Sequence, residues 1–394
     1  MTMRRAYMDH NATAPVRAEA AEAVARALLI GGNPSSVHAE GRAARKLVEE
    51  ARAAVAALVH AKPAEVVFTS GGTEAANLAL HTARAALGVE RVILSAVEHD
   101  CVRASAAALG VPVEIVGVDA HGLVDIGELA RRLDAPGKAL VAVMLANNET
   151  GVMQPVAAAA QMARQVGAVV FADAIQALGR MPVDFPALDV DMISMSAHKL
   201  GGPQGVGALI VRDGLPFEAL IRGGGQELRR RSGTENVAGI AGFGAAAKSA
   251  AREIAEMPHV QALRDRLEAA LREAVPEVRI FGHAAPRLAN TSLFSAPGLD
   301  AETLLMTLDL DGCAVSAGSA CSSGKVARSH VLGAMGVDDA LAKGAIRVSL
   351  GLANTEEEID RLVLGWSRAA VRARDKVKSS TASAPMAALA EVES

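Results

Sequence analysis

The sequence predicts an α/β protein built on a mainly parallel, seven-stranded sheet with helices on both faces, followed by a smaller α+β domain. Between residues 65 and 211, short apolar segments alternate with helical stretches, which is typical of parallel strands joined by crossover helices. The chain of 394 residues is also too long for one small core, so we expect a second domain at its C-terminal end.

Two helices are expected before the sheet begins. The first is alanine-rich and covers residues 17–29, and residues 31–34 end it with two glycines and an Asn-Pro turn, because glycine and proline interrupt helices. The second, over residues 39–59, carries its charged residues on one side and Ala, Val and Leu on the other. This amphipathic helix is expected to cover a core.

Seven apolar segments are then expected to form the strands of the sheet. These segments are residues 65–70, 91–95, 113–118, 139–145, 169–173, 192–196 and 207–211. In parallel sheets, ligands bind beyond the carboxyl ends of the strands. Five polar residues lie at such ends, namely Thr73, His99, Asn148, Asp173 and Lys199. We therefore expect the functional site at this edge of the sheet.

The C-terminal part begins after a long helix. That helix is expected over residues 236–254, and the pattern changes character at Pro258. Short strands are predicted over residues 278–281, 288–292 and 345–350. Thr355, with Glu358 three residues later, forms a capping box for a last helix. The predicted units are a large domain over 13–257, a small domain over 258–378 together with 1–12, and a mobile, Ser/Ala-rich tail over 379–394.

Composition argues against several classes of function. Aromatic residues make up only 2% of the chain and its formal charge is −4. Nucleic-acid and anionic-membrane surfaces depend on aromatic platforms or positive charge, so no such partner is expected. The sequence contains no secretory signal and no apolar stretch of bilayer length, which predicts a soluble, cytoplasmic protein. Three cysteines are too few for a disulfide framework, and no CxxC or HExxH motif suggests zinc.

Lys199 follows a buried-looking strand directly. A lysine is costly to bury unless its amine is neutralised, paired or covalently used. The covalent use is a Schiff base to an aldehyde cofactor, for which a desolvated lysine is well suited. The alternative is a lysine whose ammonium group reaches solvent from the end of the strand.

Three other strand ends each allow two interpretations. Gly71-Gly72-Thr73 offers backbone N–H groups, a hydroxyl and the positive end of a helix, which suit a phosphate, although glycine turns before helices are common. Asp173 fits either a helix N-cap or the partner of a cationic pyridinium nitrogen, with Gln176 at the phenolic oxygen of the same ring. His99 fits either a core histidine or an imidazole stacked on a flat cofactor.

Cys321 lies in a loop of small, flexible residues, with Lys325 four positions further on. A cysteine on such a loop can move and ionise, which indicates a nucleophile. Cys101 is interpreted as a packing residue, and Arg229–Arg231 as a solvated or phosphate-facing loop.

Together these segments resemble the cysteine desulfurases of the NifS/IscS type, which are class V aminotransferase-like, fold-type I enzymes that use pyridoxal 5'-phosphate (PLP). The resemblance runs from about Tyr7 to about Leu362. It rests on the motifs Met8 to Thr13, Gly32 to Ser36, Phe68 to Glu74, Glu98-His99, Asn147 to Gly151, Asp173 to Gln176, Ser196 to Lys199, Arg231 to Thr234 and Ser319 to Cys321. Any one of them could arise by chance, but all of them in this order could hardly do so.

The resemblance implies a role for each matching residue. Lys199 would hold PLP through a Schiff base. The phosphate would be bound by Gly72, Thr73, Ser196, His198 and, from the other subunit of a homodimer, Thr234. The remaining roles would fall to Asp173 at the pyridine nitrogen, Gln176 at the phenolic oxygen, His99 stacked on the ring and moving protons, Asn148 beside cofactor and substrate, and Arg347 as a clamp for the substrate carboxylate.

The resemblance also implies the reaction. Lys199 would remove the α-proton of L-cysteine with PLP as the electron sink, and the Cys321 thiolate would attack the substrate sulfur, so that alanine leaves and a persulfide stays on Cys321. A sulfur-acceptor protein, such as an iron–sulfur scaffold, would collect that sulfur. Cys321 would then be a transient ligand of an iron–sulfur cluster shared with the scaffold.

Three alternatives stay open. A class V transaminase would not need Cys321, whereas a selenocysteine lyase would use the same residues. A non-catalytic protein would hold PLP as a structural ligand or serve as a platform for sulfur-transfer partners. The sequence after about Lys378 does not resemble the end with which housekeeping members of the family dock their scaffold, so the acceptor is open as well.

Overall fold

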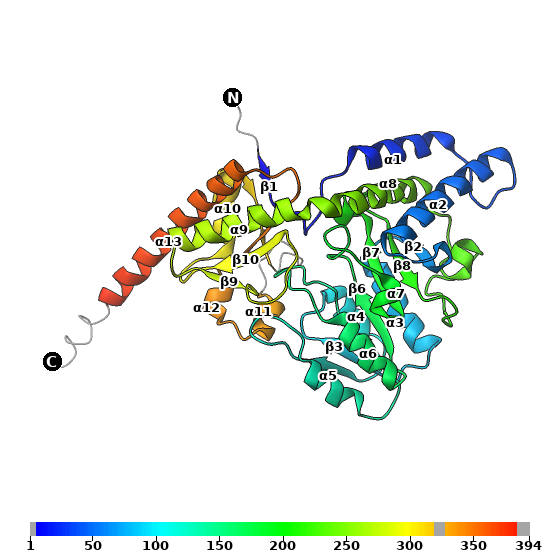
Figure 1. Ribbon diagram of the computed structural model, residues 1–394, viewed down its shortest axis with the longest axis horizontal. Helices are drawn as coiled ribbons and strands as arrows, with labels where there is room; N and C mark the ends of the chain where they lie inside the picture. Colours follow the sequence, from blue (N-terminus) through cyan, green and yellow to red (C-terminus); the bar gives the residue numbers. More distant parts are fainter. Residues whose placement is uncertain (1–4, 319–327, 384–394) are drawn as a thin grey trace, which may run out of the picture.

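The chain folds into two lobes that a pair of consecutive helices joins, as Figure 1 shows. The computed structural model describes residues 5–318 and 328–383. A seven-stranded sheet forms the centre of the larger lobe, and a four-stranded sheet lies in the smaller one. None of the helices in these described ranges is long and apolar enough to cross a membrane.

The sheet of the larger lobe has the strand order β2-β8-β7-β6-β5-β3-β4. Its strands are β2 (Val66–Thr69), β3 (Arg91–Ser95), β4 (Val113–Val116), β5 (Ala139–Ala142), β6 (Val169–Asp173), β7 (Met192–Ser196) and β8 (Gly207–Val211). From β4 to β7 all neighbours are parallel, and only β8 runs against its two neighbours. The mainly parallel, seven-stranded sheet is confirmed.

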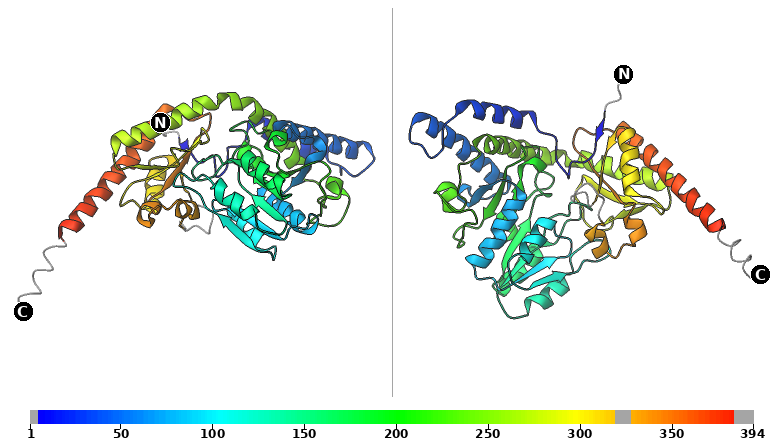
Figure 2. Two further views of the ribbon diagram at one scale, coloured as in Figure 1. Left: turned by 60° about the horizontal axis from the view of Figure 1, so that its bottom comes forward. Right: turned by 180° about the vertical axis from the view of Figure 1, so that it is seen from behind.

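Helices cover both faces of this sheet (Figure 2). They are α1 (Ala18–Ile30), α2 (Ala39–Leu58), α3 (Gly72–Ala85), α4 (Asp100–Ala107), α5 (Ile126–Leu133), α6 (Val156–Gln165), α7 (Phe185–Leu188) and α8 (Val237–Glu253), with short 3-10 turns η1 (Pro63–Glu65), η2 (Ala197–Leu200) and η3 (Gln226–Arg229). Successive strand residues point to opposite faces. Accordingly, Val170 of β6 packs in a core with Phe243 of α8, whereas Phe171 packs in a second core with Ala79 of α3.

The smaller lobe is an antiparallel sheet packed against helices. The sheet has the order β12-β13-β10-β9, with β9 (Arg279–Phe281), β10 (Thr291–Ser295), β12 (Ser316–Ala317) and β13 (Ile346–Ser349). Its helices are α9 (Met257–Ala274), α10 (Ala301–Leu310), α11 (His330–Ala334), α12 (Asp339–Ala342) and α13 (Glu356–Ser383), and η4 (Ile254–Glu256) links α8 to α9. Near the N-terminus, β1 (Ala6–Tyr7) pairs in parallel with β11 (Cys313–Ala314) of this lobe. The predicted domain boundaries stay predictions.

Two expectations for the C-terminal part differ from the structure. The strand predicted over 288–292 begins only at Thr291, because Leu288 is buried in the core of the larger lobe and its N–H donates to the carbonyl oxygen of Gly151 at 2.8 Å. Helix α13, whose capping box of Thr355 and Glu358 is confirmed, continues to Ser383. The predicted tail is therefore helical over 379–383, and residues 384–394 lie outside the described ranges.

Candidate active site

The predicted strand-end residues gather at one edge of the large sheet. Asp173 ends β6, Lys199 lies in η2 directly after β7, and His99 follows β3 as the N-cap of α4. Asp173 is buried, and burial raises the pKa of its carboxyl group, while the charges of His99 and Lys199 lower it. These opposing electrostatic effects are felt because the three side chains lie close to one another.

The start of α3 forms a cradle for an anion. Gly71 caps the helix without a side-chain bond, and the first intrahelical bond runs from the Ala75 N–H to the Gly71 carbonyl oxygen at 3.1 Å. The N–H groups that precede it point out of the helix end. A Cβ atom on Gly72 would lie 2.1 Å from Cδ1 of Ile175 and 3.7 Å from Cβ of Ser196. Only glycine lets the backbone approach this closely, which places the helix end beside Ser196.

Asp173 is a buried carboxylate fixed by a backbone hydrogen bond. Its Oδ1 accepts a hydrogen bond from the Ile175 N–H at 2.9 Å, which is a capping-type contact, although the residues that follow form turns and not a regular helix. A buried carboxylate is costly unless a positive charge faces it. A protonated pyridine nitrogen would supply that charge.

The N-terminal segment closes the site around Lys199. The ammonium group of Lys199 donates to the carbonyl oxygens of Asn11 and Ala12 at 2.6 and 2.7 Å. The amide of Gln176 donates to the same Asn11 oxygen at 3.1 Å and accepts from Arg180 at 2.6 Å. Sequence reasoning quoted the motif of residues 8–13 but gave these residues no contact, because backbone carbonyls carry no sequence signal.

His198, two residues after Ser196, is a neutral histidine. Its Nδ1 lies 3.2 Å from Oγ1 of Thr13. Burial, helped by the charge of Lys199, lowers the pKa of His198 to about 4. At neutral pH the ring is therefore uncharged and can hydrogen-bond to a phosphate without adding charge.

His99 has a defined tautomer when neutral. Its Nδ1 accepts the Cys101 N–H at 3.2 Å, and the Cys101 Sγ lies 3.1 Å from the same nitrogen. An accepting Nδ1 leaves the proton of a neutral imidazole on Nε2. Cys101, which was interpreted as packing, thus helps to orient His99.

Arg347 reaches the site from the smaller lobe. It stands on β13, is almost fully buried, and pairs with Asp9 Oδ1 at 2.7 Å. Its Nη1 donates to the carbonyl oxygen of Asn148 at 3.0 Å, and its Nε finds no partner among the described residues. A buried guanidinium with an unsatisfied donor suits a substrate carboxylate.

Two predicted residues are not brought into this group. Thr234 is exposed and lines a cavity of about 160 Å³ with Ser70 and Arg231, without Thr73 or His198. Cys321 lies outside the described residues, as does its predicted role as an iron–sulfur ligand. No three His, Cys, Asp or Glu side chains within 5–318 and 328–383 form a group that could hold a metal ion.

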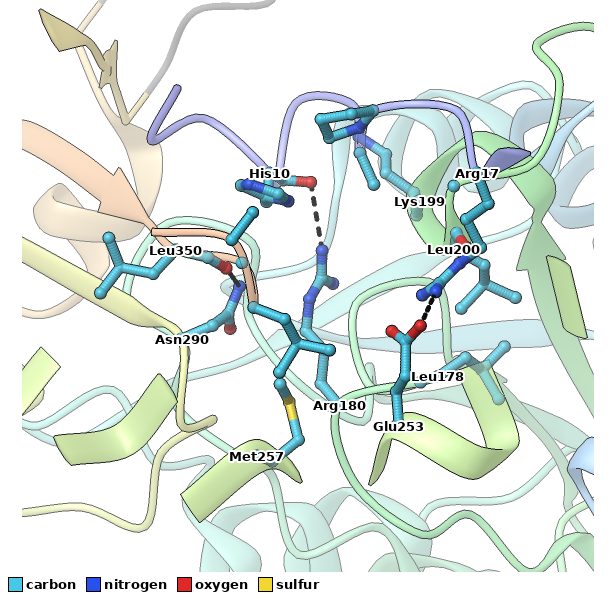
Figure 3. A pocket seen from close by; sticks show the side chains of 17 residues that line it. His10, Arg17, Leu178, Arg180, Lys199, Leu200, Glu253, Met257, Asn290 and Leu350 are labelled. Carbon is cyan, nitrogen blue, oxygen red and sulfur yellow. Dashed lines mark hydrogen bonds and ion pairs between the residues drawn. The ribbon is translucent and has the colours of Figure 1, made fainter. Parts of the chain in front are cut away.

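A separate cavity of about 250 Å³ lies where the two lobes meet (Figure 3). Figure 3 shows Arg180 reaching the carbonyl oxygen of His10, at 3.1 Å, and Arg17 paired with Glu253. Among the predicted site residues that the structure describes, Lys199 alone lines this cavity. The cavity is therefore distinct from the cradle at Gly72 and Ser196.

The donor set of the strand-end site fits PLP. The N-terminus of α3 with the close-packed Gly72, the hydroxyl-bearing Thr73 and Ser196, and the neutral His198 suit a phosphate. The buried Asp173 suits a pyridinium. Lys199 follows Ser196 and His198 in the chain, its charge acts on Asp173, and an amine there can react with an aldehyde.

Comparisons with known proteins agree with this arrangement. Residues 6–362 match the family model described as Aminotransferase class-V. A cysteine desulfurase of Cereibacter sphaeroides is 44% identical over 368 residues, covering 92% of this chain and 94% of that protein. The cysteine desulfurase IscS of Dictyoglomus turgidum is 40% identical, with 91% and 92% covered. The crystal structure of a NifS-like protein from Rickettsia africae ESF-5 superposes with a TM-score of 0.85 at 34% identity, covering 93% of this chain and 99% of that one. The fold, the site and these similarities together show that the chain belongs to the PLP-dependent cysteine desulfurases of the class V aminotransferase family.

Proposed function

We propose that this enzyme takes the sulfur atom from L-cysteine, releases alanine and keeps the sulfur as a persulfide on Cys321. The observation that supports this best is that Arg347, from the smaller lobe, meets the turn carrying Asn148 beside the Lys199, Asp173 and His99 group. A cationic clamp for a carboxylate next to an amine and a cofactor cradle suits an α-amino acid.

The residues divide the work of the first half-reaction. Gly72, Thr73, Ser196 and His198 would hold the phosphate, and Asp173 would keep the pyridine nitrogen protonated. When bound, PLP supplies an electron sink for the pair left behind by the α-proton. The Lys199 amine takes that proton, and Arg347 holds the carboxylate so that the Cα–H bond faces the amine.

The second half-reaction forms a sulfur–sulfur bond. The thiolate of Cys321 attacks the substrate sulfur, the bond between the substrate Cβ and sulfur breaks, and its electron pair stays with the carbon part. Protonation of that carbon gives alanine, and Cys321 carries the extra sulfur, so atoms and electrons balance without an added oxidant. His99, which carries its proton on Nε2 when neutral, would move protons beside the cofactor.

We further infer that two copies form a homodimer in which Thr234 of the partner subunit completes the phosphate site. Leu29 at the end of α1 and Leu228 in η3 are 88% and 68% exposed. The loop after α1 and the η3 segment line one cavity of about 450 Å³, which includes Pro34, Ser35 and Leu228. Of the two leucines, Leu228 lines this cavity, and a large apolar side chain exposed at a hollow is typical of a protein–protein interface.

The persulfide sulfur would pass to an acceptor protein in the cytoplasm, and we propose an iron–sulfur scaffold as that acceptor, with Cys321 as a transient cluster ligand. The family supports this proposal, since one of its members is named IscS.

The test compares the wild type with Cys321→Ala. Purified protein is given L-cysteine and a reductant, and the visible absorption of the cofactor, alanine and sulfide are measured. We expect cofactor absorption in both proteins but alanine and sulfide only from the wild type. The matched control is Cys313→Ala, which removes a buried thiol of the small lobe and should keep turnover.

Other outcomes favour the alternatives. Consumption of L-cysteine that stays undiminished in Cys321→Ala, without release of alanine or sulfide, would indicate a class V transaminase, which moves the amino group and does not need Cys321. A wild type with cofactor absorption but no alanine would leave a non-catalytic PLP protein. Faster release of alanine from L-selenocysteine than from L-cysteine would favour a selenocysteine lyase.

A further inference from the structure

The two described ends of the segment that contains Cys321 meet at one buried carboxylate, Glu149. The Ser329 hydroxyl, beyond the segment, donates to Oε2 of Glu149 at 2.6 Å. Before the segment, the backbone of Gly318 packs on the same atom, because a Cβ atom on Gly318 would lie only 2.6 Å from it. Glu149 is 3% exposed, so both contacts are shielded from water. Away from water, a hydrogen bond to a carboxylate, such as the one from Ser329, is strong.

A second contact holds the far end of the segment to the larger lobe. Nε2 of His330, the residue after Ser329, lies 3.0 Å from the carbonyl oxygen of Glu98, which directly precedes His99. Ser329 also caps α11, since its Oγ accepts the Leu332 N–H at 3.0 Å. The chain that leaves the Cys321 segment is therefore fixed in direction as well as in position.

Glu149 is itself held in a rigid turn. The side-chain oxygen of Asn147 accepts the N–H groups of Glu149 and Thr150 at 2.9 and 3.0 Å. Between these residues stands Asn148, whose carbonyl oxygen accepts from Arg347. In this turn, Asn148 thus contacts Arg347, the proposed carboxylate clamp. The next residue, Glu149, contacts Gly318 and Ser329 at the two ends of the Cys321 segment.

We propose that Glu149 is a positioning residue for the sulfur-transfer step, because it ties Gly318 and Ser329 to the turn that also contacts Arg347. This inference rests on the proposed function, in which Cys321 is the nucleophile. Gly318 and Ser329, the described residues on either side of the segment, are held at one carboxylate, and transfer between two sulfur atoms depends steeply on their distance. Glu149 does not touch the reacting atoms.

The test removes the contact without touching the cofactor. Ser329→Ala deletes the hydroxyl that Glu149 accepts, and Ser329→Thr restores it. Because Ser329 also caps a helix, the matched control is Asp338→Ala, which removes the N-cap of α12 in the same lobe. In each holoenzyme, single-turnover formation of the Cys321 persulfide from L-cysteine is followed by mass spectrometry, together with KM and the visible cofactor spectrum.

We expect Ser329→Ala to form the persulfide about tenfold more slowly, with KM and the cofactor spectrum unchanged, and Ser329→Thr and Asp338→Ala to stay near the wild-type rate. Should Ser329→Ala fail to fold, Gly318→Ala, which places a methyl group against Glu149 Oε2, is expected to slow the same step. The inference is overturned if Ser329→Ala, or Gly318→Ala in its place, forms the persulfide as fast as Asp338→Ala. It is also overturned if the KM and the cofactor spectrum of that variant change along with the rate. Failure of the proposed function looks different, because the wild type would then form no persulfide on Cys321.

Discussion

His10 is a histidine that its surroundings keep neutral. Burial and the nearby guanidinium groups of Arg180 and Arg17 lower its pKa to about 4. The unfolded chain, with an ordinary histidine pKa near 6.5, binds a proton more readily between these two values. Stability from this group is therefore full above pH 6.5 and is lost as the pH falls towards 4.

This difference predicts a measurable pH dependence of folding. Between pH 7 and pH 5, the unfolding free energy of the wild type should fall by about 2 kcal/mol more than that of His10→Asn, whose side chain does not titrate. Urea unfolding of both holoproteins at the two pH values measures it. The pH dependence of all other groups cancels in this comparison, so equal losses in the two proteins would show that His10 is not held neutral.

The site residues that could be predicted from the sequence are those that follow apolar strands. Asp173, Lys199 and His99 could be found because an apolar segment predicts a strand, and the polar residues after it then lie at the edge of the sheet. Asn11 and Arg180 could not be found, because Asn11 acts through its carbonyl oxygen and Arg180 through a contact with Gln176. Such contacts depend on how distant segments meet.

Helix α3 shows how an element positions a site through one glycine. A Cβ atom on Gly72 would collide with Ile175, two residues after Asp173, whereas a Cβ atom on the neighbouring Gly71 would meet nothing within 4 Å. Gly72→Ala must therefore displace either the end of the Ile175 side chain or the helix end itself. Gly71→Ala adds the same methyl group without that displacement.

We expect Gly72→Ala to weaken PLP binding about tenfold and Gly71→Ala to leave it near the wild-type value. Titration of each apoprotein with PLP, followed by visible absorption, gives the dissociation constants. Equal affinity in the two variants would contradict the proposed role of the close approach at Gly72.

Strands that lie within one lobe were predicted well, whereas a segment whose residues pack in both lobes was not. Strands β3, β6, β7 and β8 begin and end at the predicted residues, because both of their faces are buried in the larger lobe. Leu288 packs in the core of the larger lobe, although the strand predicted to start at this residue belongs to the smaller lobe. Helix α13 outruns its prediction because neither glycine nor proline follows Gly365 until Pro385.

At the scale of the whole molecule, the η3 segment is shaped to present Leu228. Glu227, Leu228 and Arg229 have positive φ angles of 47°, 56° and 67°, which are unfavourable for residues other than glycine. The buried carboxylate of Glu227 holds this shape, since it pairs with Arg52 at 2.8 Å and accepts the Phe68 N–H at 2.9 Å. A strained backbone that exposes a leucine is consistent with a contact to a second subunit.

The dimer and its shared site can be tested together by mixing subunits. One subunit carries Thr234→Ala and the other Lys199→Ala, so each homodimer is impaired. If Thr234 acts across the interface, the mixed dimer contains one complete site, formed by Lys199 of the first subunit and Thr234 of its partner, and the mixture should regain up to about half of the wild-type activity per mixed dimer. If Thr234 acts within its own subunit, no site is complete and mixing restores nothing. Leu228→Asp in both subunits is the control, because a charge on the proposed interface should shift the protein towards the monomer by light scattering and abolish the recovery.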